Sequence, residues 1–183
     1  MITIIDFSPR GNGNCTSVRN IIAEFYNRTD VRQYKVTADI IGPCANCNYE
    51  CLTPGVICPL VSEQQKEIMC NASDSELVYF IVPNFCGYPN ANYFAFNERS
   101  VGFFNMDREA MKRYMNVPKR FVVISNTESD QFKNAMKLQT NGEPDILYLK
   151  TSKYKVRSTA GDLMDCDEAR VELIQWLGKP QIG

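Results

Sequence analysis

Glu-Leu-Val-Tyr-Phe-Ile-Val, residues 76–82, is the stretch that decides the fold. It is short, rich in β-branched and aromatic residues, without polar alternation, and Pro83 follows it at once, which is typical of a strand buried on both faces. Similar runs occur at residues 2–7, near the start of the chain, and at 121–124. Strands buried on both faces belong to parallel sheets, whose crossover connections are usually helices.

Segments with helical periodicity lie between these strands, and Ser62 and Gln65 have the spacing of a capping box. The alternation of strands and helices predicts one domain over residues 1–183, a three-layer α/β/α sandwich with a five-stranded parallel sheet in flavodoxin-like order. The further strands are expected at 33–41 and 145–149, and the helices at 16–27, 61–69, 92–99, 107–115, 131–138 and 167–177.

The composition excludes several classes of function. The 183 residues include 20 basic and 21 acidic ones, a net charge of −1, so no basic excess is present to bind nucleic acid. There is no membrane-length apolar run and no signal-peptide pattern, so we expect a cytoplasmic protein that binds no membrane. The chain has no histidine, which excludes Ser-His-Asp triads, Cys-His pairs and His-ligated metal sites.

The cysteines are the strongest anomaly in the composition. Half of the eight, Cys44, Cys47, Cys51 and Cys58, lie in an aperiodic loop, residues 42–59, inserted in the domain. Cytosolic thiols stay reduced, so such clusters more often hold metal or do redox work than form disulfides. Four thiolates suit a 4Fe–4S cluster or a zinc ion, and a metal-free thiol set is the alternative. Cys70, outside the loop, is expected to pack in the core.

The loop after the first strand has the character of an anion site. Ser-Pro-Arg-Gly-Asn-Gly-Asn, residues 8–14, joins that strand to a helix, so free backbone N–H groups and the positive helix end point at one place. The loop is neither a Walker P-loop nor a GxGxxG motif, and an ordinary polar turn is the alternative interpretation.

Three motifs resemble one family. Ser-Pro-Arg-x-x-Gly-Asn at 8–14, Pro-Asn-Phe-Cys-Gly at 83–87 and Phe-Asn-Glu-Arg at 96–99 look like segments of the NADPH-dependent FMN reductase and iron–sulfur flavoprotein family, in the flavodoxin-like superfamily. The resemblance implies that FMN lies across the first and second motifs. Residues 125–129 offer polar groups for the pyrimidine edge of a flavin, and an ordinary helix N-terminus capped by Ser129 or Asp130 is the alternative interpretation. The implied cofactor-binding residues are Ser8, Arg10, Gly13, Asn14, Cys15, Thr16 and Ser17 for the phosphate, and Pro83, Asn84, Phe85, Cys86, Gly87, Ser125 and Asn126 for the ring.

Two departures from the family pattern bear on these expectations. Cys15 stands where the family usually has Thr or Ser; a thiolate there would repel phosphate, so Cys15 should stay protonated or point away. Iron–sulfur flavoproteins carry a compact cysteine motif at the place of the 42–59 loop, with gaps of two, two and roughly five residues. Here the gaps are two, three and six, a close but imperfect match.

The sequence therefore predicts an FMN-binding oxidoreductase or electron-transfer flavoprotein whose four-cysteine 4Fe–4S site exchanges electrons with the flavin. A metal-free NAD(P)H-dependent FMN reductase and a non-catalytic, zinc-stapled interaction domain are the alternatives. A phosphatase is disfavoured because Arg19 follows Cys15 by four residues, whereas that chemistry needs Cys-x5-Arg. Flavin reduction requires no side-chain acid or base, so no catalytic residue is named. NAD(P)H or a redox protein is the expected partner, and a homo-oligomer, dimer or tetramer, is the expected assembly.

Overall fold

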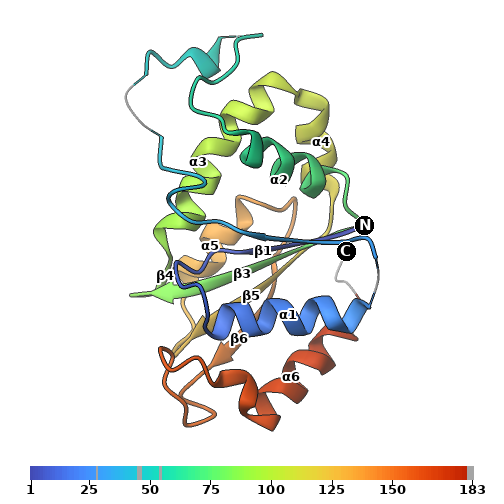
Figure 1. Ribbon diagram of the computed structural model, residues 1–183, viewed down its shortest axis with the longest axis vertical. Helices are drawn as coiled ribbons and strands as arrows, with labels where there is room; N and C mark the ends of the chain where they lie inside the picture. Colours follow the sequence, from blue (N-terminus) through green and yellow to red (C-terminus); the bar gives the residue numbers. More distant parts are fainter. Residues whose placement is uncertain (28, 45–46, 54, 181–183) are drawn as a thin grey trace.

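The computed structural model of the chain describes residues 1–27, 29–44, 47–53 and 55–180. A parallel sheet lies between two layers of helices, with α1 and α6 on one face and α2, α3, α4 and α5 on the other (Figure 1). The helices are α1 (Asn14–Tyr26), α2 (Glu63–Ser73), α3 (Ala91–Met106), α4 (Arg108–Asn116), α5 (Asp130–Lys137) and α6 (Asp167–Leu177), with 3₁₀ turns η1 (Glu50–Leu52) and η2 (Leu163–Asp165).

The sheet has the strand order β2-β1-β3-β5-β6, and every pair along this path is parallel. The two-residue strand β4 pairs antiparallel with the end of β3 and forms a hairpin beyond the main sheet. The expected α/β sandwich with five parallel strands is thus confirmed. The strands are β1 (Ile2–Asp6), β2 (Val31–Lys35), β3 (Leu77–Phe85), β4 (Tyr88–Pro89), β5 (Lys119–Ser125) and β6 (Asp145–Lys150).

The central strand β3 explains why the sheet needs both helical layers. Its side chains alternate between two hydrophobic cores: Phe80 packs with the α2–α5 layer, whereas Tyr79 packs with the α1 and α6 layer, and both are fully buried. Burying such a side chain contributes roughly 1.5–3 kcal/mol, so neither face of β3 tolerates solvent. Within the described ranges, no helix combines the length and apolar character needed to cross a membrane.

Three elements differ from the sequence-based expectation. The strand expected at 33–41 is β2, which ends at Lys35; Val36 and Ile41 are still buried, but in the loop that follows. Strand β3 continues through Pro83, because β1 ends opposite Ile81 and that side of β3 has no further ladder to complete.

Helix α3 is the third difference: it runs through Gly102 to Met106 instead of stopping near residue 99. Elsewhere the local chemistry is as expected, since Ser62 caps α2 by accepting a hydrogen bond from the Gln65 N–H at 3.1 Å. The prediction for Cys70 is wrong, because this thiol is exposed on α2.

Candidate functional site

The loops that follow β1, β3 and β5 meet at the carboxyl edge of the sheet and enclose two adjoining cavities. The smaller, ≈ 200 Å³, lies beside the β1–α1 loop, and the larger, ≈ 640 Å³, lies between the β3–β4 hairpin and the β5–α5 loop. Asn84, Ile124 and Ser158 line both. Ligands of doubly wound sheets bind at this edge, so the cavities are the natural candidate site.

The beginning of α1 leaves hydrogen-bond donors for the smaller cavity. Gly13 is the N-cap residue, so no side chain caps the helix, and the first turn carries no acidic residue. The first N–H groups of a helix lack intrahelical acceptors and attract anions. Arg10 is exposed and lines the same cavity, so it adds a positive charge. The loop therefore has the electrostatic character of an anion site.

A buried carboxylate at the end of β1 holds the β1–α1 loop through hydrogen bonds. Asp6 is fully buried and accepts hydrogen bonds from the Ser8 N–H at 2.8 Å and the Thr16 hydroxyl at 3.3 Å, and its ion pair with Lys35 measures 3.1 Å. The Ser17 hydroxyl donates to the Gly13 carbonyl at 3.3 Å. The hydroxyls of Thr16 and Ser17 thus bond inside the protein.

Cys15 lies within the core below the loop, 4% exposed, beside Val18 and Ile22. Burial, followed by the charge of Asp6, raises the pKa of the Cys15 thiol. The thiol is therefore neutral at physiological pH and places no negative charge beside an anion. This agrees with the expectation that Cys15 stays protonated.

Asn14 is directed at another part of the chain. Its Nδ2 donates to the Ser158 carbonyl at 3.0 Å, and its Oδ1 accepts from the Leu163 N–H at 3.0 Å. Arg10 donates in the same direction, to the Thr159 carbonyl at 2.6 Å. Both side chains expected to bind phosphate therefore hold the connection between β6 and η2.

The β3–β4 hairpin and the β5–α5 loop are joined by hydrogen bonds. Asn84 donates to the Ser125 hydroxyl at 2.5 Å and accepts from the Gly87 N–H at 2.8 Å, while the Ser129 hydroxyl donates to the Gly87 carbonyl at 2.7 Å. Ser129 occupies the N-cap position of α5, but its hydroxyl is used here and does not cap the helix. These bonds fix the wall of the larger cavity before any ligand arrives.

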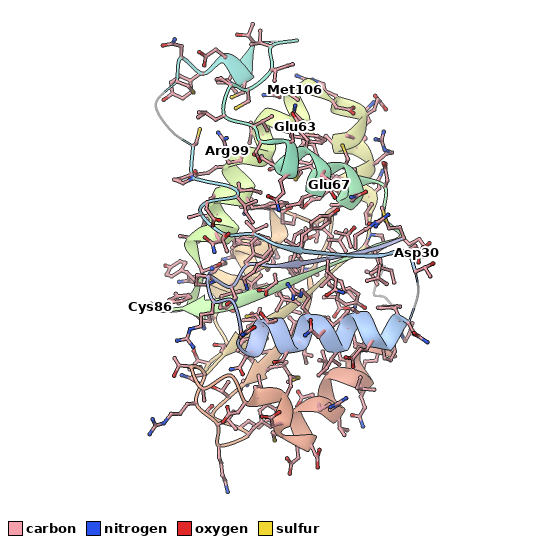
Figure 2. All side chains as sticks on the ribbon, viewed as in Figure 1. Asp30, Glu63, Glu67, Cys86, Arg99 and Met106 are labelled. Carbon is pink, nitrogen blue, oxygen red and sulfur yellow. The ribbon has the colours of Figure 1, made fainter. Side chains whose placement is uncertain are left out.

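The tip of this hairpin is a tight turn. Cys86 and Gly87 have φ values of 53° and 87°, the left-handed combination that closes short hairpins. Cys86 is exposed at the edge of the molecule (Figure 2). The Phe85 side chain is 55% exposed and lines the smaller cavity. The structure thus brings the second predicted motif to the same cavities as the first.

The remaining predicted ring contacts divide into two groups. Ser125 is buried and its hydroxyl bonds to Thr127, whereas Asn126 is exposed and pairs through Oδ1 with the Thr151 hydroxyl. Both residues, with Pro83 close by, line one cavity or the other.

The cysteine loop packs against the far half of α3 and not against the cavities. A Cβ added at Gly102 would lie 2.9 Å from the Cβ of Cys58 and 3.5 Å from that of Cys51, so only glycine allows this approach. Burial, followed by the neighbouring thiols of Cys58, Cys47 and Cys44, raises the pKa of Cys51. Cys51 thus lies within electrostatic range of the other three thiols, and Cys51 and Cys58 both pack at Gly102.

The proximity of these thiols does not amount to a metal-binding arrangement. Throughout the described ranges, no three cysteine or acidic side chains are arranged to hold one metal ion, so the predicted metal site has no support from this arrangement. A buried cation on α3 faces the loop: Arg99, 6% exposed, contacts the Cys58 Sγ at 3.8 Å through Nη1, and its Nε has no partner among the described residues (Figure 2).

Ser158 and Thr159 are the site residues that sequence reasoning missed. They lie in the connection between β6 and η2 and line the cavities because Asn14 and Arg10 hold their carbonyls. One pattern pointed to them: residues 151–162 form a long aperiodic stretch, and long loops in compact domains are often functional.

Comparison with known proteins gives a fold but no close relative. No protein-family model and no curated protein matches the sequence. Among solved structures, the Trp repressor binding protein from Bacillus subtilis matches 99% of this chain and 100% of its own, with a TM-score of 0.63 and 10% identity. An NADH:FMN oxidoreductase in its apo form matches 96% of this chain and 85% of its own, with a TM-score of 0.55 and 11% identity.

A flavodoxin, described as WrbA-like, from Agrobacterium tumefaciens matches 96% of this chain and 94% of its own, with a TM-score of 0.50 and 10% identity. The chain has a flavodoxin-like fold. This confirms the fold implied by the sequence motifs, and identities this low concern the fold alone.

Proposed function

We propose that this flavodoxin-like chain is an FMN-binding oxidoreductase that takes electrons from NADH or NADPH. The observation that carries the proposal is the pair of adjoining cavities at the carboxyl edge of the sheet, one beside the uncapped start of α1 and Arg10. One structural neighbour is an NADH:FMN oxidoreductase, which supports the same assignment.

The residues present fit FMN. A phosphate suits the smaller cavity because the α1 amides and Arg10 supply donors and positive charge without an acidic side chain in the first turn. The ring suits the wall built by Asn84 and Gly87, where backbone and amide groups are already fixed by hydrogen bonds. Exposed Phe85 offers an apolar surface for a flat heteroaromatic ring.

Bound FMN would supply both hydride and single-electron chemistry. The chain's own contribution is to bind the phosphate, orient the ring and keep water from it. The hydrogen-bonded hairpin and β5–α5 loop hold their groups in place in advance, which lowers the ordering cost of binding. None of these tasks needs a side-chain acid or base. A homo-oligomer and a cytoplasmic location remain predictions.

Flavin titration tests the proposal. The purified protein should bind FMN with one flavin per chain and markedly tighter than riboflavin, because the first loop attracts an anion. NADH or NADPH should then bleach the absorbance of the bound flavin. A protein that takes up neither flavin is not an FMN oxidoreductase.

A metal centre held by Cys44, Cys47, Cys51 and Cys58 is a second, finer proposal. The described thiols are not arranged as ligands, so no reaction step is derived through a cluster. The supporting observation is Arg99, which has no ion pair with any residue that the structure describes. A buried cation without an anionic partner is costly, and metal-bound thiolates at Cys58 would compensate its charge.

Metal analysis of protein prepared without oxygen decides between the remaining alternatives. A 4Fe–4S cluster predicts about four irons per chain, and a structural zinc predicts about one zinc and no colour. Cys58→Ser should remove most of the metal, whereas Cys70→Ser, on exposed α2, should leave it. No metal after reconstitution would leave a metal-free FMN reductase.

A further inference from the structure

The connection between β6 and η2, residues 151–162, folds back across the β1–α1 loop and is called the strap below. Three hydrogen bonds fasten it: Arg10 Nη1 to the Thr159 carbonyl at 2.6 Å, Asn14 Nδ2 to the Ser158 carbonyl at 3.0 Å, and the Leu163 N–H to Asn14 Oδ1 at 3.0 Å. The two segments are close enough that a Cβ on Gly161 would lie 3.5 Å from the Gly13 Cα. The strap therefore lies directly against the β1–α1 loop.

Asn14 is committed to this strap. Its side chain is 5% exposed, and both ends of its amide bond the strap or the residue after it. Breaking these bonds would leave the buried Leu163 N–H without its acceptor, which costs more than a bond to a ligand would gain. Asn14 thus acts by holding the strap, and not as the phosphate ligand that the sequence motif suggested.

The strap offers free side-chain hydroxyls to the smaller cavity, which the β1–α1 loop does not. The hydroxyls of Thr16 and Ser17 are bonded inside the protein, whereas Ser158 and Thr159 are exposed and line the smaller cavity. The charges around the strap agree with this: Lys150 pairs with Glu128 and Lys153 with Glu172, and the strap itself has no acidic residue before Asp162.

Arg157 precedes Ser158 directly and is exposed, but it lines neither cavity. The side chains that the strap offers to the smaller cavity are therefore the two hydroxyls of Ser158 and Thr159. Hydroxyl donors suit a phosphate, because hydrogen bonds to a charged oxygen are stronger than those to a neutral one.

We propose that the strap completes the phosphate site: Ser158 and Thr159 bind the terminal phosphate monoester of the flavin, while Asn14 is a positioning residue that holds the strap in place. This inference rests on the proposed FMN function and names a part of the site that the sequence motifs do not contain. It also separates the roles of two neighbouring elements, since the β1–α1 loop supplies backbone N–H groups and the strap supplies side chains.

Comparing FMN with riboflavin tests the strap, because the two flavins differ only by the phosphate. Replacing both hydroxyls, Ser158→Ala with Thr159→Ala, should weaken FMN binding by about tenfold or more, as expected for hydrogen bonds to a charged group. Riboflavin affinity should change less than about twofold, within the effect of an exposed surface substitution. Thr140→Ala is a matched control, since its hydroxyl bonds to Gly142 in the α5–β6 connection, far from the cavity lining.

The positioning role of Asn14 has a readout that needs no flavin. In Asn14→Ala the Leu163 amide loses its acceptor, so its hydrogen exchange in the free protein should accelerate at least about tenfold, together with that of residues 158–161. Equal exchange in the variant and the wild type overturns this role.

The outcomes for the strap and for the proposed function are distinct. Wild type that binds FMN tightly, with a double variant that binds it equally well, overturns the strap assignment alone. Wild type that binds neither flavin overturns the proposed function and the strap assignment with it. Parallel loss of FMN and riboflavin in the double variant also overturns the assignment, because the hydroxyls would then not act on the phosphate.

Discussion

Replacing Gly102 by alanine tests how the cysteine loop sits on α3. Two effects oppose each other. Alanine is the better helix former, which alone would raise the free energy of unfolding by roughly 0.5–1 kcal/mol. However, its Cβ would lie 2.9 Å from the Cβ of Cys58, and overpacking of this kind costs about 1–3 kcal/mol.

The steric clash outweighs the gain in helix propensity, so Gly102→Ala lowers the free energy of unfolding. The atom that must move is a Cβ fixed to the backbone of Cys58, so a side-chain rotation gives no relief and the loop itself must shift. We expect a net loss of about 1 kcal/mol, or a smaller loss if the loop lifts away from α3. In either case Cys58, 7% exposed in the wild type, becomes more accessible.

Urea unfolding and alkylation of thiols by iodoacetamide, with mass spectrometry to resolve each cysteine, measure the two effects. Cys58 should react several-fold faster in Gly102→Ala, while the exposed Cys70 reacts at an unchanged rate. Gly178→Ala is the control: its nearest contact would be 3.7 Å, so no overpacking is expected there. A Gly102→Ala protein that is as stable as the control, with unchanged labelling of Cys58, would refute the packing argument.

The buried ion pair and a buried amine give further predictions. Lys35→Met leaves the fully buried Asp6 without its cation and should lower the free energy of unfolding by about 3 kcal/mol. Adding Asp6→Asn to the same chain should restore more than half of this loss. A Lys35→Met protein as stable as the wild type in urea unfolding would contradict the prediction. Burial lowers the pKa of Lys119 from 10.5 to about 7. Between these pH values Lys119 is protonated in the unfolded chain but neutral in the folded protein. The free energy of unfolding therefore rises with pH from about 7 to 10, and this contribution to stability is lost as pH falls through 7. Lys119→Met should remove this rise, and a wild-type minus variant difference that is flat with pH would exclude it.

The sequence predicted the inner strands of the sheet well because β1, β5 and most of β3 are buried, whereas the edge strand β2, which has no buried residue, was predicted with the wrong bounds. Uninterrupted apolar runs such as residues 76–82 have few alternatives, and α6 is found at the predicted bounds, Asp167–Leu177. The errors fall where tertiary contacts override local propensity. The helix predicted at residues 92–99 continues to Met106 as α3, and the glycine at 102 lets Cys58 pack closely on it.

The candidate site was predicted in part for a similar reason. The loops after β1, β3 and β5 follow from the strand order, so their meeting at one edge was predictable. Their hydrogen bonds were not: Asn14 reads as a phosphate ligand in sequence but bonds with Ser158 and Leu163, both more than a hundred residues away. The cysteine spacing predicted that the thiols gather, whereas coordination depends on geometry that spacing does not encode.

Helix α3 sets a fixed distance between the cavities at the carboxyl edge of the sheet and the cysteine loop. It begins near the cavities at the carboxyl edge of the sheet, where Asn90 and Asn92 both donate to the Phe7 carbonyl at 2.5 and 3.0 Å, and it reaches the cysteine loop at Gly102 (Figure 1). A rise of 1.5 Å per residue separates Ala91 from Gly102 by about 16 Å along the axis. Hydride transfer needs reacting atoms about 3–3.5 Å apart, so no hydride can pass directly between the two places. The helix therefore keeps anything bound in these cavities out of the range of direct hydride transfer to the cysteine loop.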